Sequence, residues 1–302
     1  MTEKENLAIH IQDLVKDFGN NRGLFGVSLD VKKGQFIGIM GENGAGKSTL
    51  LRILMDFVRK DSGTTEILSH DCRKASLQVK ELVAYVPGEI NFPDLPSGKD
   101  FLREQMLLYG LKDTGKADRL IEELQLDIRA LPKRMSKGMK QKLALVNALM
   151  IDVPILLLDE PTTGLDPLMR ERFRQLLSKE NKEGRTILMT SNTFEDLDGI
   201  ADSVYLLSQG KILDCYHSDS QILKNYRFYC VGFDDKESQK RYVDIHKDNI
   251  RSLDENRREC LVQVPKAELF SFLSELESPT IHYYYEEESL MEVYFRNRRN
   301  RG

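Results

Sequence analysis

Gly41-Glu42-Asn43-Gly44-Ala45-Gly46-Lys47-Ser48-Thr49 is the stretch of this chain that decides its fold. Its spacing is G-x-x-x-x-G-K-[ST], the pattern of a phosphate-binding P-loop. The glycines are needed because consecutive backbone N–H groups must curl around an anion, which requires φ values that side chains resist. Lys47 supplies positive charge to the terminal phosphates, and the Ser48 hydroxyl supplies a magnesium ligand. We therefore expect phosphate contacts along the loop, from Gly41, Asn43, Gly44, Ala45, Gly46, Lys47, Ser48 and Thr49.

The segments on either side of the loop support this interpretation. Gln35–Met40 is a short apolar run typical of a buried strand, and Thr49–Val58 places apolar side chains at helical spacing. Strand, glycine loop and helix in this order direct the N-terminus of the helix at a phosphate. The sequence therefore predicts binding of a nucleoside triphosphate.

The composition is that of a globular protein with an evenly charged surface. The 302 residues suffice for one large or two ordinary domains, and the formal net charge is −4 with 30% charged residues. Without an excess of positive charge, nucleic acid is not expected as a partner. The four cysteines form no C-x-x-C pair and no metal-ligand spacing with the five histidines, which indicates reduced thiols in a cytoplasmic protein.

The sequence contains no segment typical of a signal peptide or a membrane span. Its N-terminus, Met-Thr-Glu-Lys-Glu-Asn, opens with charged residues. The longest apolar region, Leu143–Leu158, is interrupted by Asn147, Asp152 and Pro154, which prevents it from spanning a bilayer. If the protein works at a membrane, another chain must supply the spans.

Strand and helix patterns alternate along most of the chain. We expect strands at 7–15, 27–31, 35–40, 81–86, 155–158, 186–190 and 204–207, and helices at 97–130, 139–150, 169–183 and between the last two strands. The unalternating run Ile155–Leu158 is typical of a central parallel strand covered on both faces. The predicted fold is α/β, a P-loop NTPase with a mostly parallel core sheet, antiparallel N-terminal strands and a helical insertion at about 90–135.

The pattern changes to shorter, more polar elements after about His217. We expect two domains, the P-loop domain at 1–216 and a small α+β domain at 217–302. The latter is predicted to contain strands at 226–232, 259–264 and 281–285 and helices at 266–276 and 289–296. The cationic tail at 296–301 is either a solvated chain end or a contact for anionic lipid or a partner.

Two acidic residues follow the predicted central strand directly. Asp159, at the carboxyl end of a buried strand, would hold magnesium through water, and Glu160 would polarise the attacking water. Two adjacent acids after a strand also occur in ordinary solvated turns, but a P-loop in the same chain favours the magnesium site. Upstream, Ser136 is placed to cap the helix that follows it.

Two longer segments carry a resemblance to a known family. They are Ser136-Lys137-Gly138-Met139-Lys140-Gln141-Lys142 and Leu156-Leu157-Leu158-Asp159-Glu160-Pro161-Thr162-Thr163-Gly164-Leu165-Asp166-Pro167. With the P-loop, they resemble the ATPase subunit of an ATP-binding cassette (ABC) transporter, in the exporter branch associated with drugs, antimicrobial peptides and lantibiotic immunity. The resemblance covers residues 7–215.

The resemblance implies a role for each motif. The loop 41–49 matches the Walker A motif, and Phe18 matches the aromatic residue that stacks on adenine. Ser136 and Gly138 match the signature segment, which in this family faces the γ-phosphate bound by the opposite subunit. Asp159 and Glu160 match the Walker B aspartate and the catalytic glutamate, and Asp166 matches the acid that crosses the dimer interface. Each active site would then need two cassettes, which dimerise when ATP binds.

Two positions depart from the common family pattern. Gly88 stands where most cassettes have the glutamine of the Q-loop, which leaves Glu89 as the nearest polar side chain for magnesium or water. The switch histidine is replaced by Asn192. An asparagine amide donates a hydrogen bond to a γ-phosphate oxygen, but it carries no positive charge and relays no proton. We expect slow hydrolysis while ATP binding is retained, or pairing with a second, complete cassette.

The resemblance implies an ATP- and Mg²⁺-dependent subunit of a membrane exporter. It would lie on the cytoplasmic face of the cell membrane and pass cassette closure to polytopic transmembrane permease subunits through the helical insertion. An alternative is a cassette that acts as an ATP-gated regulatory subunit without transport. Relatives of that kind usually have two cassettes in one chain or a long coiled-coil insertion, which this sequence lacks. A small-molecule kinase would give no reason for the segment at Ser136.

Overall fold

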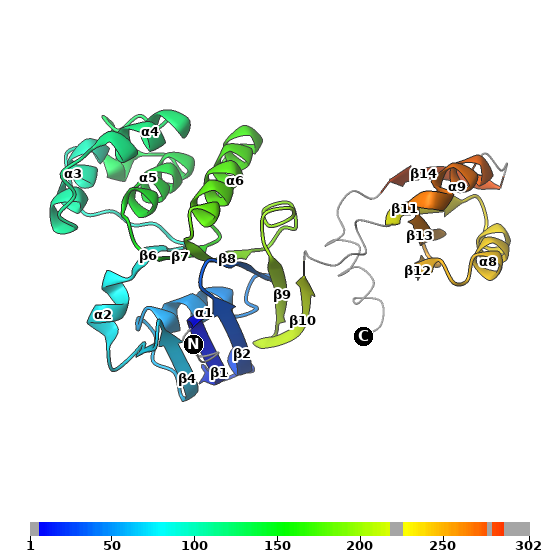
Figure 1. The fold of residues 1–302 in the computed structure, drawn as a ribbon, viewed down its shortest axis with the longest axis horizontal. Coiled ribbons are helices and arrows are strands. Elements are labelled where there is room, and N and C mark those ends of the chain that lie inside the picture. Colours follow the sequence, from blue (N-terminus) through cyan, green and yellow to red (C-terminus); the bar gives the residue numbers. More distant parts are fainter. Residues whose placement is uncertain (1–5, 218–225, 277–279, 287–302) are drawn as a thin grey trace. The chain divides into compact units, whose positions relative to one another are not determined.

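The computed structural model describes residues 6–217, 226–276 and 280–286. The chain forms two compact units, Met1–His217 and Ser218–Gly302. The first unit contains two sheets and a group of helices, and the second contains one sheet with helices (Figure 1). The α/β fold with a mostly parallel core sheet and antiparallel N-terminal strands, expected from the sequence, is confirmed in the first unit.

A six-stranded sheet forms the centre of the first unit. Its order is β10-β9-β3-β8-β7-β6, and the strands from β9 to β6 are parallel. The bounds are β3 Phe36–Met40, β6 Val83–Val86, β7 Ile155–Asp159, β8 Thr186–Ser191, β9 Ser203–Ser208 and β10 Lys211–His217. All residues of β3, β7 and β8 are buried, as expected of strands covered on both faces.

The parallel arrangement brings the carboxyl ends of five strands to one edge, and four of these strands lead into predicted site residues. β3 ends just before Gly41, β6 just before Pro87-Gly88, β7 at Asp159 and β8 just before Asn192. Motifs that lie far apart in the sequence therefore meet along this edge. This is the place where open α/β sheets bind their ligands.

A second, antiparallel sheet packs next to the first through α1, Lys47–Leu54 (Figure 1). Its order is β2-β1-β4-β5, with β1 Leu7–Asp17, β2 Gly23–Lys32, β4 Ser62–Ile67 and β5 His70–Asp71. Leu50 and Leu54 of α1 share one core cluster with Ile11 of β1 and Leu157 of β7. The P-loop helix is therefore held between two sheets.

Four further helices of the first unit form a separate group beyond the central sheet (Figure 1). They are α3 Gly98–Leu108, α4 Gly115–Glu123, α5 Lys137–Met150 and α6 Pro167–Lys182. Ser136 caps α5 and Asp166 caps α6, each accepting a backbone N–H three residues ahead. The short helix α2, Ser76–Glu81, lies before β6.

Three sequence-based helix assignments are corrected by the structure. The region 97–130 is helical only in α3 and α4, and Gly110, with φ 66°, follows the end of α3. The helix predicted between β8 and β9 is wrong, because residues 192–200 form bends and turns. Ser191 Oγ accepts the N–H of Thr193, which competes with helical bonding at the start of the segment, and Gly199 has φ 73°. The P-loop helix also ends earlier than Val58, because Asp56 takes a left-handed conformation with φ 57°.

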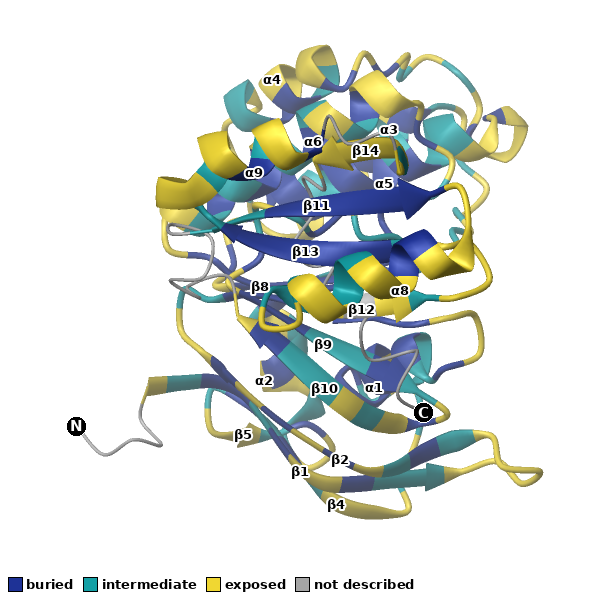
Figure 2. Cartoon of the chain, turned by 90° about the vertical axis from the view of Figure 1, so that its right-hand side faces the viewer, coloured by how far each residue is buried: buried dark blue, intermediate teal, exposed yellow. Residues whose placement is uncertain are grey.

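The second unit has a four-stranded antiparallel sheet of order β12-β13-β11-β14. The strands are β11 Tyr226–Phe233, β12 Ile250–Asp254, β13 Glu259–Pro265 and β14 Ile281–Glu286, and the helices are α8 Lys236–Ile245 and α9 Leu269–Glu275. Both helices pack on alternate residues of β11 and β13, and Figure 2 shows both strands as largely buried. The predicted helix at 289–296 and the cationic tail lie outside the described residues.

Candidate functional site

A cleft of about 700 Å³ lies over the P-loop. It is formed by the β1–β2 turn, the P-loop and α1, and the segments that follow β6 and β7. Its lining residues are Phe18, Arg22, Gly23, Asn43, Gly44, Gly46, Lys47, Ser48, Thr49, Arg52, Gly88, Glu89 and Glu160. Most of the residues that the P-loop pattern and the resemblance selected therefore share one cavity.

The backbone of the P-loop has a shape that only glycine permits. Gly46 has φ 110° and is the N-cap residue of α1. It has no side chain to accept a hydrogen bond from the first N–H groups of the helix, so these groups remain available to a ligand in the cleft. A Cβ on Gly41 would lie 2.2 Å from the carbonyl oxygen of Leu207. Within the loop, Gly41 and Ala45 are buried, whereas Asn43 and Gly44 are exposed.

Lys47 reaches across the loop with a buried ammonium group. Its Nζ donates to the carbonyl oxygens of Gly41 at 2.6 Å and Glu42 at 3.1 Å. It also forms an ion pair with Oε1 of Glu160 at 3.0 Å. The lysine of the P-loop and the acid after β7 are thus in direct contact, and the side chain of Lys47 is only 4% exposed.

Thr190, near the end of β8, holds Asp159 of β7 and the adjacent Glu160 in place. Its Oγ1 accepts the N–H of Glu160 at 3.0 Å and donates to Oδ1 of Asp159 at 2.8 Å. Glu160 has φ 45°, a conformation that non-glycine residues rarely adopt without such support. The strained backbone turns the Glu160 side chain to the cleft while Asp159 stays fully buried.

The chemistry around Asp159 fits a magnesium ion. Its Oδ2 is buried and has no hydrogen-bond partner, which leaves one carboxylate oxygen for a cation or its water. Gly88 packs against this oxygen, where a Cβ would lie 3.1 Å away. Among the described residues no group of three or more His, Cys, Asp or Glu could hold a metal alone. Mg²⁺ at this position would rely on Asp159, Ser48 and nucleotide phosphates, with Glu89 at the rim of the same cleft.

Phe18 contributes an exposed aromatic ring to the lining of the cleft. The ring is 55% exposed and lies in a turn closed by hydrogen bonds between Phe18 and Arg22 and between Arg22 and Gly19. Lys16 Nζ lies 5.2 Å from the centre of the ring. A ring of this kind offers a stacking surface for a base.

Sequence reasoning missed two cationic residues of the cleft. Arg52 lies one helical turn after Ser48 on α1, and Arg22 closes the turn that begins at Phe18. The four-residue helical spacing from Ser48 could have identified Arg52. Arg22 had no comparable signal, because its place depends on how the β1–β2 turn packs over the P-loop.

The signature residues lie outside the cleft of their own chain. Ser136, Gly138 and Asp166 are absent from its lining, as are Asp159 and Asn192. Gly138 approaches Gly164 so closely that a Cβ would lie 2.6 Å from the Gly164 carbonyl oxygen. The signature segment and the loop before α6 therefore form one surface, with Ser136 and Asp166 both exposed.

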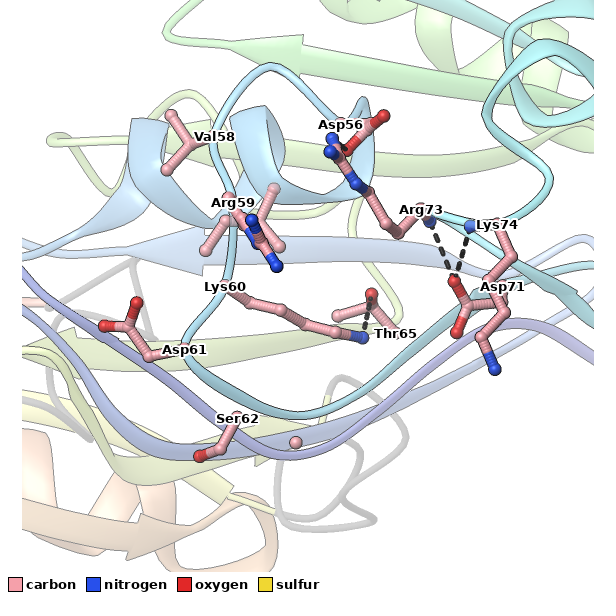
Figure 3. Close-up of a pocket in the computed structure, with 12 residues that line it drawn as sticks. Asp56, Val58, Arg59, Lys60, Asp61, Ser62, Thr65, Asp71, Arg73 and Lys74 are labelled. Carbon is pink, nitrogen blue, oxygen red and sulfur yellow. Dashed lines mark hydrogen bonds and ion pairs between the residues drawn. The ribbon is translucent and has the colours of Figure 1, made fainter.

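A separate hollow beside α1 shares no residue with the cleft (Figure 3). It is lined by several cationic side chains, but many of its charged groups already bond to neighbouring residues. Arg73 pairs with Asp56 at 2.8 Å, Lys60 donates to the Thr65 hydroxyl at 2.9 Å, and Asp71 accepts two backbone N–H groups. An anion entering here would have to compete with these contacts, so we assign this hollow no ligand.

Comparison with known proteins identifies the family. The ABC transporter family model matches residues 24–163. The ABC transporter ATP-binding protein NatA of Bacillus subtilis (strain 168) is 33% identical over 222 residues, which is 67% of this chain and 87% of NatA. The chain belongs to the ABC transporter ATP-binding proteins. The cassette resembles the solved ATP-binding subunit of an ABC transporter, with 25% identity and a TM-score of 0.64 over 72% of this chain and 92% of that one.

A relative named for the transport of bacitracin also matches. The bacitracin transport ATP-binding protein BcrA of Bacillus licheniformis is 27% identical over 245 residues, which is 79% of this ABC subunit and 80% of BcrA. The resemblance to exporter-type ATP-binding subunits is therefore confirmed. Within residues 6–217, 226–276 and 280–286, every helix is too short or too polar to cross a bilayer.

Proposed function

We propose that this ABC subunit binds and hydrolyses MgATP and thereby drives a membrane exporter. The observation that carries the proposal is the meeting of Lys47, Asp159 and Glu160 at one sheet edge, with Glu160 facing the cleft. Mg²⁺ bound there would neutralise charge that develops on the phosphates. Lys47 would hold the terminal phosphates and Glu160 would accept a proton from the attacking water.

We propose that the working unit contains two cassettes. Ser136 and Asp166 cap exposed helix ends on the surface joined by Gly138 and Gly164, outside the P-loop cleft of the same chain. A second copy or a different cassette would present this surface to the bound γ-phosphate, where the N-terminus of α5 favours negative charge. The dimer would form when ATP fills the cleft.

We propose that the cassette, residues 1–216, acts on polytopic permease subunits at the inner face of the cell membrane. The helical part at about 90–135 supports this assignment. Leu107 and Leu108, at the end of α3, are 73% and 76% exposed, and Tyr109 follows them at 43%. An exposed apolar cluster is typical of an interaction surface. Residues 217–302 would be an appendix to this motor.

Asn192 supports a second candidate function, an ATP-gated regulatory subunit with little turnover. The residue is exposed after β8 and offers a neutral amide where a histidine would offer charge. In this case binding of ATP, rather than its hydrolysis, would be the signal. The two candidates share the same cleft and dimer and differ in the rate of phosphate release.

The first test is phosphate release by the purified chain with ATP and Mg²⁺, and with EDTA as the matched control. We expect release that depends on magnesium, together with ATP-dependent dimerisation in analytical ultracentrifugation. Dimerisation without phosphate release would favour the regulatory subunit. Absence of both would contradict the proposed function.

A further inference from the structure

The turns after β8 contain a buried carboxylate, Asp196, to which the proposed function assigns no role. Asp196 is 3% exposed. Its Oδ2 accepts three hydroxyl groups, from Thr162 at 2.7 Å, Ser191 at 2.7 Å and Thr193 at 2.9 Å. A buried charge requires such compensation, because an unpaired one would be strongly destabilising.

The three hydroxyl donors lie on the two segments that carry the reaction. Thr162 comes two residues after Glu160, and Ser191 and Thr193 flank Asn192 on either side. Asp196 therefore ties the segment after β7 to the segment after β8. Thr190 makes the companion link, through Asp159 and the N–H of Glu160.

We propose that Asp196 is a positioning residue for ATP hydrolysis, which fixes Asn192 relative to Glu160. The inference rests on the proposed function, since it assigns a role within the same reaction. The side chain of Asn192 is exposed, so its direction depends on the backbone of its own turn. That backbone is held by hydroxyl groups on both neighbours, and the three hydroxyls converge on one oxygen of Asp196.

If Asp196 has this role, its loss should slow the chemical step and leave nucleotide binding unchanged. Asp196 lies outside the lining of the cleft, and neither Thr162 nor Thr193 is part of it. Loss of the carboxylate should leave the contacts of Phe18 and the P-loop intact. It should lower kcat, because the amide of Asn192 would spend less time at the γ-phosphate.

The test compares full-length Asp196→Asn with wild type and with Glu195→Gln, an exposed neighbouring acid, as the matched control. Asparagine keeps the shape and one acceptor oxygen but removes the charge that holds three donors. We expect kcat to fall about ten-fold with ATP Kd within about two-fold of wild type. Glu195→Gln should match wild type in both. An unchanged kcat in Asp196→Asn would overturn the proposal.

A double-mutant cycle distinguishes positioning from a merely structural role. The loss caused by Asp196→Asn should nearly disappear in an Asn192→Ala background, since the positioned group is then missing. If kcat of the double variant falls by the product of the two single-variant factors, the proposal is wrong. If Asp196→Asn fails to fold, Thr193→Val removes one donor and takes its place in the same cycle. A wild type no faster than Glu160→Gln would contradict the proposed function itself, and this inference with it.

Discussion

Nζ of Lys47 lies 3.0 Å from Oε1 of Glu160, so the cation of the P-loop and the acid of the following motif neutralise each other across the cleft. The lysine is buried and the glutamate is 25% exposed. Under the proposed function, a γ-phosphate placed over the loop would compete with Glu160 for the same ammonium group. ATP binding would therefore break this pair and release the carboxylate for catalysis, which links occupancy of the cleft to activation of Glu160.

The first prediction concerns this ion pair. Glu160→Gln removes the competing charge and also the repulsion between the carboxylate and phosphate, so ATP should bind about two- to ten-fold more tightly. Isothermal titration with ATP measures the change. Glu171→Gln, an acid of an exposed ion pair on α6, is the control and should leave the ATP Kd unchanged. Weaker binding by Glu160→Gln would contradict the competition.

The second prediction concerns the switch position. Asn192→His should raise kcat, because an imidazole adds positive charge beside the γ-phosphate. The gain should be largest below about pH 6.5, where free imidazole is protonated. A pH profile of phosphate release measures it. Asn192→Ala is the control and should be slower than wild type, and a His variant that is equal or slower would contradict the assignment.

The third prediction concerns adenine recognition. Phe18→Ala should weaken ATP binding by about 1–3 kcal/mol, because the stacking surface is lost. Fluorescence titration with a labelled ATP measures the Kd. Phe270→Ala, an 86% exposed phenylalanine in the second unit, is the matched control. Equal affinities for the two variants would show that Phe18 makes no base contact.

The fourth prediction concerns the shared site. Gly138→Val places a side chain against the Gly164 carbonyl oxygen, where even a Cβ would lie at 2.6 Å. ATP-dependent dimerisation should be lost while the monomer still binds ATP, since the P-loop cleft lies elsewhere. Gly115→Ala at the start of α4 is the control. Light scattering after gel filtration measures the mass, and an intact ATP-bound dimer would exclude this surface from the interface.

The fifth prediction concerns alkaline stability. Burial raises the pKa of the Cys72 thiol to about 12. Above about pH 8.5 the unfolded thiol ionises and the folded one does not, so unfolding releases a proton and stability falls as the pH rises. Between pH 8.5 and 9.5 the titration of this thiol should lower the free energy of unfolding by about 1 kcal/mol. Urea unfolding at both pH values measures how the free energy of unfolding changes with pH. This change should be smaller in Cys72→Ala. An equal change in the variant would contradict the assignment.

The sequence was most informative where function depends on neighbouring residues. The P-loop from Gly41 to Thr49 needs glycine conformations and a helix start that local sequence specifies, and the structure places them at the end of β3. The buried strands β3 and β7 were predictable from their apolar runs. The meeting of their carboxyl ends followed from parallel topology.

The sequence was less informative where structure depends on distant contacts. β4 has the polar pattern Ser-Gly-Thr-Thr-Glu-Ile and becomes a strand because it pairs with β1. The apolar spacing after β8 favoured a helix, yet the hydroxyls around Asn192 bond to Asp196 instead. Thr162 joins this network from another strand end, a contact that no local pattern encodes.

The most direct test of the account is steady-state phosphate release from MgATP by the full-length chain and by Glu160→Gln, prepared and assayed together. Both proteins should bind ATP. If Glu160 activates the attacking water, wild type should release phosphate at least about ten-fold faster than the variant. Equal rates from two proteins that both bind ATP would contradict the account.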